Sequence, residues 1–216
     1  MAESSRPAAS PTGPARFIVL EGIDGSGKSS QIEPLVHWLR RLGRSVVSCR
    51  DPGATAAGDA VRQILLHRQE ITLAPTTEML LYMAARAQLV AEVIRPALDR
   101  GQWVVSDRFL PANIVYQGHA GGLDADVIRA VGKVATAGIA PDLILLLDVD
   151  PATAATRMDR PLDRLESRGD DYRRRLREGY LREAAADPAR FEIIDATADM
   201  AAVGERIRTA VETRFG

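Results

Sequence analysis

Lysine, cysteine and long apolar runs are all scarce in this chain of 216 residues. No apolar run approaches the roughly 20 residues that a membrane-spanning helix needs, so we expect no membrane partner. The single cysteine, Cys49, has no partner for an internal disulfide, which is typical of a reducing compartment. We therefore expect a cytoplasmic protein in which Cys49 is a small apolar residue of a strand.

Strong charge of one sign is also missing. The chain has 28 basic and 29 acidic residues and a formal net charge of −1, which excludes nucleic acid as the expected main partner. Only two of the basic residues are lysines, Lys28 and Lys133. Since arginine occupies nearly every other basic position, Lys28 in the segment EGIDGSGKSS needs a specific explanation.

The N-terminal segment differs in composition from the rest of the chain. Residues 1–15 are rich in Ala, Ser and Pro and lack the apolar stretch of a secretory signal. They cannot bury a core, so we expect a disordered tail; an organellar transit peptide is the alternative, and Glu3 argues against it. The remaining residues, 16–216, have enough apolar material for one domain.

Short apolar runs alternate with longer amphipathic ones, which is typical of a parallel sheet flanked by helices. The short runs are nearly continuous, as expected for strands buried on both faces. The predicted strands are 16–22, 45–50, 102–107, 142–149 and 190–195. The predicted helices are 29–42, 57–68, 76–99, 111–119, 124–137, 151–158, 168–186 and 199–214. The pattern predicts an α/β fold in three layers with a five-stranded parallel sheet.

The segment from Gly22 to Ser29 matches G-x-x-x-x-G-K-[ST] between a predicted strand and a predicted helix. Glycines let backbone N–H groups face a phosphate chain, and the helix N-terminus adds partial positive charge. Lys28 places a compact charge beside the transferred phosphoryl group, where the planar fork of arginine is not equivalent. The motif predicts a P-loop kinase fold that binds a nucleoside triphosphate. Its expected binding residues are Gly22, Ile23, Asp24, Gly25, Ser26, Gly27, Lys28, Ser29 and Ser30.

A P-loop site also needs an acid at the end of a neighbouring strand to organise the metal. Asp107 and Asp148 both end predicted strands. We favour Asp107 because Arg108 follows it at the strand end where open α/β sheets bind ligands; a structural ion pair is the alternative. Asp148 is equally consistent with capping the next helix. The expected metal is Mg²⁺, with Ser29 and Asp107 as its protein ligands.

Arginines supply the cations for a second phosphate. The chain lacks the Asn-Lys-x-Asp element of GTPases, which favours a small-molecule kinase. Arg50 and Arg108 each end a predicted strand, and guanidinium groups suit a bidentate grip on a monophosphate. Residues 157–168 include Arg157, Arg160, Arg164 and Arg168, and we predict a short lid there; a solvated charged arm is the alternative.

The order of several segments resembles the thymidylate kinase family, from about Arg16 to the C-terminus. These segments are LEGIDGSGKSS, CRDPGAT, LLYMAARAQLV, WVVSDRFLPANIVYQG, PDLILLLDVDP and RPLDRLESRG. The resemblance implies an ATP-dependent nucleoside monophosphate kinase that uses Mg²⁺ and acts as a homodimer. It implies transfer of the γ-phosphoryl group to a pyrimidine deoxynucleoside monophosphate, converting dTMP to dTDP.

The resemblance also implies roles at matching positions. Asp24 corresponds to the loop acid near the acceptor sugar and phosphate, Tyr82 to the ring that stacks on thymine, and Arg86 to the arginine that reads the base edge. The remaining acceptor-binding residues are Arg50, Arg108, Asn113, Tyr116 and Gln117. The catalytic residues are Lys28, Arg108, Arg157, Arg160 and Asp24, with the lid supplying the catalytic arginine.

Five positions depart from the usual family pattern: Asp51, Ala54, Ala85, Phe109 and Ala112. We expect them around the acceptor pocket, which would then be larger or less hydrogen-bonded. A modified or 5-substituted pyrimidine nucleotide, or dUMP, is the alternative acceptor. A deoxynucleoside kinase and a non-catalytic nucleotide-binding regulator are further alternatives.

Overall fold

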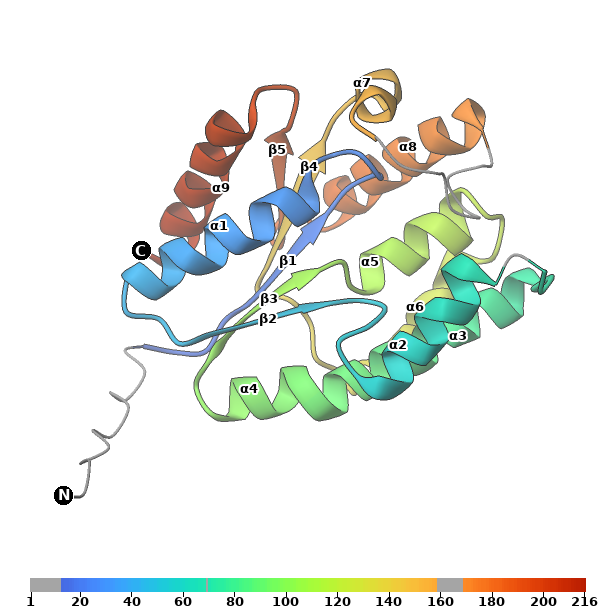
Figure 1. Cartoon of the computed structure of the whole chain (residues 1–216), viewed down its shortest axis with the longest axis horizontal. Helices are drawn as coiled ribbons and strands as arrows, with labels where there is room; N and C mark the ends of the chain where they lie inside the picture. Colours follow the sequence, from blue (N-terminus) through green and yellow to red (C-terminus); the bar gives the residue numbers. More distant parts are fainter. Residues whose placement is uncertain (1–12, 69, 159–168) are drawn as a thin grey trace.

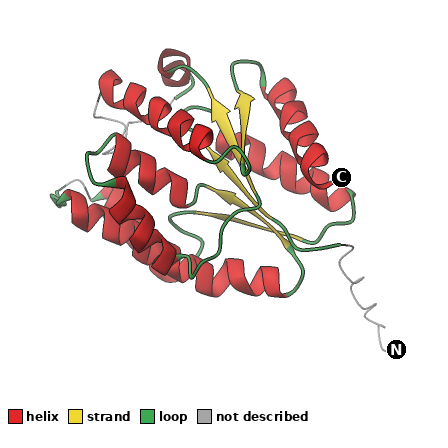
Figure 2. Ribbon diagram, turned by 180° about the vertical axis from the view of Figure 1, so that it is seen from behind, coloured by secondary structure: helices red, strands yellow, loops and turns green. Residues whose placement is uncertain are grey.

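The computed structural model describes residues 13–68, 70–158 and 169–216. Five parallel strands form one sheet in the order β2-β3-β1-β4-β5 (Figure 2). The strands are β1 Phe17–Glu21, β2 Val46–Arg50, β3 Trp103–Asp107, β4 Leu143–Asp148 and β5 Phe191–Asp195. All five predicted strands and the predicted α/β sheet are confirmed.

Helices cover both faces of the sheet (Figure 1). On one face, α1 Lys28–Arg41 packs against β1, β2 and β3, and α9 Met200–Phe215 packs against β4 and β5. On the other face, α4 Arg95–Asp99 packs against β3, and α8 Asp170–Ala186 packs against β4 and β5. The predicted three layers are therefore present.

The remaining helical segments lie at the carboxyl end of the strands or outside the second face (Figure 1). They are α2 Ala56–Arg62, α3 Pro75–Leu89, α5 Leu110–Asn113, α6 Ala125–Ala135 and α7 Pro151–Thr156, with the π-helical segments η1 Gln63–His67, η2 Val90–Ile94 and η3 Ile114–His119. Segments α3, η2 and α4 follow one another without a break, so the single long helix predicted over 76–99 is confirmed with a π-helical turn inside it.

The central strands are fully buried because helices cover both of their faces. Every residue of β1 is buried, as are the first five residues of β4. Cys49 is a buried free cysteine of β2, and burial raises the pKa of its thiol to about 12. The prediction that Cys49 is a small buried strand residue is confirmed.

The strand register aligns the polar ends of three strands. Asp107 lies opposite Leu20 of β1 and opposite Arg50 of β2. Because parallel strands point the same way, Glu21, Arg50 and Asp107 reach one edge of the sheet. This edge is where ligands bind in open α/β folds.

Carboxylates attach helix α8 to the rest of the molecule. Arg177 donates to both carboxylate oxygens of Asp148, at 2.7 and 2.8 Å. Glu183 accepts from Arg129 of α6 at 2.7 and 2.8 Å and lies 2.7 Å from the imidazole of His119. The sequence was equally consistent with a metal-binding role and a helix-capping role for Asp148. In this structure Asp148 forms a bidentate ion pair with Arg177.

Two predicted segments lie wholly or mostly outside the described residues: the tail over 1–15, of which 13–15 are described, and the lid over 157–168, of which 157 and 158 are described. Among the described residues, no helix is long and apolar enough to cross a membrane.

We expect Leu145→Ala to lower the free energy of unfolding by about 2–5 kcal/mol, because it leaves a cavity in the centre of the sheet. Leu145 is fully buried, and its register partner in β5, Glu192, is exposed. Chemical denaturation followed by circular dichroism measures the change. Glu192→Ala is the matched control and should stay within about 0.5 kcal/mol of wild type; equal effects of the two substitutions would contradict the core described above.

Candidate active site

The loop between β1 and α1 folds tightly around its own lysine. The Lys28 ammonium donates to the backbone carbonyls of Gly22 and Ile23, both at 2.9 Å. Gly22 and Gly25 have positive φ values, +140° and +82°. A Cβ on Gly25 would lie 2.2 Å from the carbonyl oxygen of Ala154 in α7, so only glycine fits at this position. The motif allows any residue there.

Lys28 is buried, and this environment weakens its hold on the proton. Burial lowers the pKa of its ammonium to about 8, with a further contribution from the charge of Arg108. Asp24, Asp107 and Glu21 act in the opposite direction. Lysine fits here as a compact point charge that turns back onto two loop carbonyls.

The two predicted metal ligands are in direct contact. The Ser29 hydroxyl donates to the Asp107 carboxylate at 2.8 Å, joining the start of α1 to the end of β3. Hydroxyl and carboxylate oxygens are ligands that Mg²⁺ prefers, so this pair fits that ion. Their role as metal ligands stays a prediction.

A cavity of about 690 Å³ opens at the carboxyl edge of the sheet. The predicted residues that line it are Asp24, Gly25, Ser26, Gly27, Lys28, Ser29, Ser30, Arg50, Tyr82, Arg86, Asp107, Arg108, Asn113, Tyr116, Gln117 and Arg157. Gly22 and Ile23 contribute the carbonyls that hold Lys28 and do not line the cavity. Arg160 lies outside the described residues.

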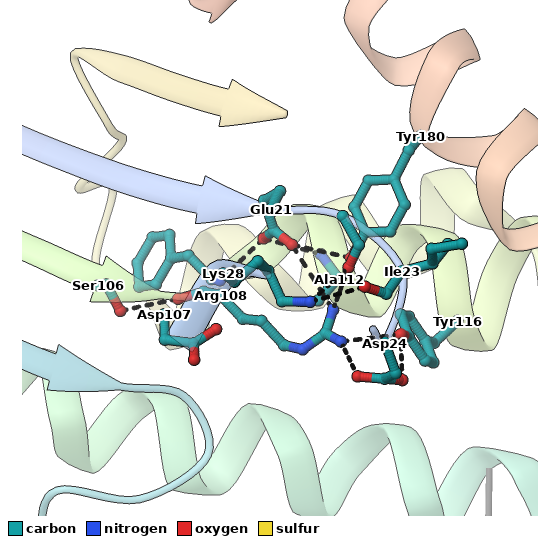
Figure 3. A network of polar contacts seen from close by, with 12 residues as sticks. Glu21, Ile23, Asp24, Lys28, Ser106, Asp107, Arg108, Ala112, Tyr116 and Tyr180 are labelled. Atoms are coloured by element: carbon teal, nitrogen blue, oxygen red, sulfur yellow. Dashed lines mark hydrogen bonds and ion pairs between the residues drawn. The ribbon is translucent and has the colours of Figure 1, made fainter. Parts of the chain in front are cut away.

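Arg108 is the centre of a polar network (Figure 3). Its guanidinium contacts the Asp24 carboxylate and donates to the Tyr116 hydroxyl at 2.9 Å, the Tyr180 hydroxyl at 2.9 Å and the Gly22 carbonyl at 3.1 Å. Tyr116 also donates to Asp24 at 2.7 Å. The phosphate loop, η3 and α8 are thus joined through one side chain.

The charge of Asp24 is fixed by this network. Burial alone would raise the pKa of its carboxyl, but the charges of Arg108 and Lys28 and the hydrogen bond from Tyr116 outweigh burial and keep the pKa below its usual range. Asp24 is therefore ionised at neutral pH and faces the cavity between the phosphate loop and Tyr116 (Figure 3).

The backbone of Arg108 is left-handed, with φ of 70°, which is uncommon for a residue with a side chain. Two hydrogen bonds hold the backbone there. The Arg108 N–H donates to the Leu20 carbonyl at 3.0 Å, and Ser106 Oγ donates to the Arg108 carbonyl at 2.8 Å. Such a conformation costs of the order of 1–3 kcal/mol and persists where neighbouring contacts enforce it.

Glu21 is a buried acid that the sequence analysis did not select. One of its oxygens accepts the backbone N–H groups of Phe109 at 2.9 Å and Ala112 at 3.3 Å, and the other accepts the Tyr180 hydroxyl at 2.8 Å. Burial raises the pKa of Glu21 to about 6, although Arg108 and the hydrogen bonds lower it in part. Its sequence signal is an acid between a buried strand and the first motif glycine.

Arg86 forms part of the cavity wall. This residue of α3 is 1% exposed, and its Nε donates to Asp51 at 2.5 Å. Its Nη1 donates to the Asn113 amide oxygen at 2.5 Å, and its Nη2 to the Phe109 carbonyl at 3.1 Å. Tyr82, one helical turn earlier, lines the same cavity.

The five departures from the family pattern divide into two groups. Asp51 and Ala112 line the cavity, and the shorter side chain of Asp51 still reaches Arg86. Ala85 and Phe109 are buried in the core and Ala54 is exposed, and none of these three lines the cavity. The expectation that all five surround the acceptor pocket is wrong for Ala54, Ala85 and Phe109.

Arg157, which follows α7, also lines the cavity. Its guanidinium donates to the backbone carbonyls of Ala196 at 2.8 Å and Thr197 at 3.0 Å, in the loop between β5 and α9. Its catalytic role stays a prediction. The sequence analysis missed its neighbours along the cavity wall, which are Met158, Ala196, Ala198, Asp199, Met200 and Val203.

Comparison with known proteins places this site in a family. The family model described as thymidylate kinase matches residues 20–207. The chain belongs to the thymidylate kinase family. It is 44% identical over 199 residues to a thymidylate kinase of Bifidobacterium longum, covering 91% of this chain and 97% of that protein. It is 45% identical over 196 residues to a thymidylate kinase of Thiobacillus denitrificans, covering 90% and 95%.

A solved thymidylate kinase structure has the same fold. The crystal structure of the enzyme from Ehrlichia chaffeensis superimposes with a TM-score of 0.78 at 26% identity, covering 92% of this chain and all of that chain. The resemblance to thymidylate kinases stated from the sequence is confirmed. The same comparison confirms the predicted α/β fold with a five-stranded parallel sheet.

In this thymidylate kinase family member, Glu21 makes stability depend on pH. Its folded-state pKa of about 6 lies above the ordinary value of 4.5, so the folded protein binds this proton more tightly than the unfolded chain does. The contribution of Glu21 is present at low pH and is lost as the pH rises through about 6. The free energy of unfolding of wild type relative to Glu21→Gln should fall by about 2 kcal/mol between pH 4 and pH 7.

Urea denaturation at several pH values measures this difference. Glu192 is an exposed glutamate of β5, and Glu192→Gln is the control. Its free energy of unfolding should change with pH in parallel with that of wild type. Parallel curves for wild type and Glu21→Gln would show that Glu21 titrates normally.

Proposed function

We propose that this chain transfers the γ-phosphoryl group of ATP to dTMP and forms dTDP, with Mg²⁺ bound alongside ATP. It is an ATP-dependent nucleoside monophosphate kinase of the thymidylate kinase family. The observation that supports the proposal most directly is one continuous cavity with a phosphate loop at its centre and arginines beyond it. The predicted cytoplasmic location belongs to this proposal.

The donor nucleotide fits the half of the cavity around the phosphate loop. Backbone N–H groups of the loop and the start of α1 face the phosphates, and Lys28 provides the charge beside them. Arg157 and the apolar side chains of Met200 and Val203 line the far end, where the base of ATP would lie. Ser29 and Asp107 would hold Mg²⁺, which neutralises charge on the phosphate oxygens when bound.

The acceptor nucleotide fits the other half. Arg50 and Arg108 line it with guanidinium groups that suit a monophosphate, and Arg62 adds a third cation that the sequence analysis missed. Burial lowers the pKa of Arg62, and the neighbouring charge of Arg50 lowers it further, so cations are concentrated at this end. Tyr82 and Arg86 line the end where the thymine would lie.

The reaction then needs little proton transfer by the protein. The acceptor phosphate is already ionised, so these residues act by aligning two phosphates and stabilising the charge between them. We assign Asp24, which contacts Arg108 and Tyr116, to the acceptor sugar and phosphate.

Other acceptors are less well supported. The relatives named above are thymidylate kinases, which favours dTMP over a modified pyrimidine nucleotide or dUMP. A deoxynucleoside kinase would need a carboxylate base for a neutral hydroxyl, and Asp24 is instead held by an arginine. A non-catalytic regulator would not require the cluster of arginines at the acceptor end.

We expect dTMP to give the fastest ADP release when dTMP, dUMP and thymidine are each tested as the acceptor in separate coupled assays. Lys28→Ala should lower kcat by about 100-fold or more, because it removes the charge beside the transferred group. Lys133→Ala is the matched control, since Lys133 is the only other lysine and is exposed on α6. Normal turnover by Lys28→Ala, or thymidine as the best acceptor, would contradict the proposal.

We also propose a homodimer that uses the outer face of α3 and α6. These helices pack against each other, and their outward side chains include Leu80, 48% exposed, Val127, 54% exposed, and Val134, 80% exposed. Large apolar side chains gathered on neighbouring helices are typical of a surface that a partner covers. A second copy of this chain is the partner that the family resemblance implies.

Val134→Lys should convert the dimer to a monomer, because it places a charge in the proposed interface. Size-exclusion chromatography with light scattering measures the mass. Leu42→Lys is the matched control: it also changes an exposed apolar residue at a helix C-terminus, where lysine suits the helix dipole, but on α1. A monomeric wild type, or equal effects of the two substitutions, would contradict the interface.

A further inference from the structure

Glu78 is a buried acid of α3 that stands one hydrogen bond behind the wall of the cavity. It is 5% exposed and does not line the cavity, but its carboxylate accepts from the Gln117 amide at 2.9 Å. We propose that Glu78 is a specificity-determining residue: it fixes the orientation of the amides that face the acceptor base. This inference rests on the proposed function, because it assigns the base of the acceptor nucleotide to this wall.

The hydrogen bonds behind the wall form a chain with one direction. Arg86 donates to the Asn113 amide oxygen, Asn113 donates through its amide nitrogen to the Gln117 oxygen at 2.9 Å, and Gln117 donates to Glu78. A guanidinium can only donate, and a carboxylate accepts. Arg86 therefore requires the amide oxygen of Asn113 as its acceptor, and Glu78 accepts a hydrogen bond from the amide nitrogen of Gln117.

Both ends of this chain are buried, so water does not compete for the amides. Arg86, Asn113, Gln117 and Glu78 are all 5% exposed or less. An amide whose oxygen and nitrogen can exchange places offers a ligand no fixed pattern, whereas these two amides are fixed from both sides. The acceptor half of the cavity consequently meets a wall of constant polarity.

That polarity matches one pyrimidine and opposes another. Thymine presents the O4 acceptor beside the N3–H donor, whereas cytosine presents an amino group beside a bare N3. Of the five N–H groups of Arg86, four bond Asp51, Met83, Asn113 and Phe109, which leaves one Nη2–H for a base. Beside it lies the Asn113 oxygen, which has a second lone pair after its bond from Arg86. This arrangement complements thymine and places like groups against cytosine.

Helix α3 aligns the three side chains involved. Glu78, Tyr82 and Arg86 are spaced four residues apart, so they lie along one face of the helix. The same face thus provides the ring proposed to stack on the base, the arginine proposed to read its edge, and the acid that orients the amides. A change at Glu78 should alter recognition of the base without altering the phosphate loop.

The test compares wild type with Glu78→Leu, Glu78→Asp and Glu78→Gln, measuring kcat and KM for dTMP and dCMP at saturating ATP. For Glu78→Leu, the KM for dTMP should rise about tenfold and the dTMP-over-dCMP ratio of kcat/KM should fall about tenfold, while kcat for dTMP and KM for ATP stay within about twofold. Glu78→Gln keeps an acceptor oxygen at this position, and Arg86 still fixes the direction of the chain from its other end, so this variant should retain the wild-type ratio. Glu78→Asp withdraws the carboxylate by one methylene and should give a smaller loss in the same direction.

Glu92→Leu is the matched control, because Glu92 accepts from the amide of Gln88 on the adjoining helical turn but is exposed. Thermal melts separate folding defects from changes in recognition, and Glu78→Asp remains available if Glu78→Leu does not fold. A wild-type dTMP-over-dCMP ratio in both Glu78→Leu and Glu78→Asp overturns the inference, as does an equal loss in Glu78→Gln. Absence of dTMP turnover by wild type would overturn the proposed function itself.

Discussion

The partly buried guanidinium of Arg108 makes the contacts on which the geometry of the site depends. Placing a cation out of water costs several kcal/mol unless opposite charges and hydrogen bonds surround it. Asp24, Tyr116, Tyr180 and the carbonyl of Gly22 supply those partners from the phosphate loop, η3 and α8 (Figure 3). Because each of these segments must approach Arg108, their positions relative to one another are fixed before any ligand binds.

Environment gives similar carboxyl groups different properties within this small region. Asp24 faces two cations and a tyrosine hydroxyl, which keep its pKa low despite burial. Burial dominates at Glu21 and raises its pKa to about 6, although hydrogen-bond donors surround it. Burial also raises the pKa of Asp51, even though that residue contacts Arg86. The site therefore has a firmly ionised carboxyl group at Asp24, whereas Glu21 behind the cavity and Asp51 in its wall bind their protons more tightly than carboxyl groups usually do.

The fold was predictable because its signals are local: buried parallel strands are continuous apolar runs, and the phosphate loop is a contiguous motif. Among the described residues, those predicted from this motif and from the family resemblance line one cavity, with Gly22 and Ile23 just behind it. Glu21, Glu78 and Tyr180 were missed because their roles arise from contacts between distant segments. The Tyr180–Glu21 bond joins residues 159 positions apart, and the Gln117–Glu78 bond joins residues 39 positions apart. The spacing of residues along the chain does not predict such pairs.

Arg108 combines a strained, left-handed backbone with the contacts that join three segments of the site. Glycine adopts this conformation without steric penalty, so a substitution to glycine would relieve the backbone there. It would also remove the guanidinium that joins the loop, the cavity and α8. Removing one partner of a buried ion pair costs about 3–5 kcal/mol, which exceeds the roughly 1–3 kcal/mol of backbone strain that glycine would relieve. A glycine at position 108 is therefore unfavourable for stability as well as for turnover.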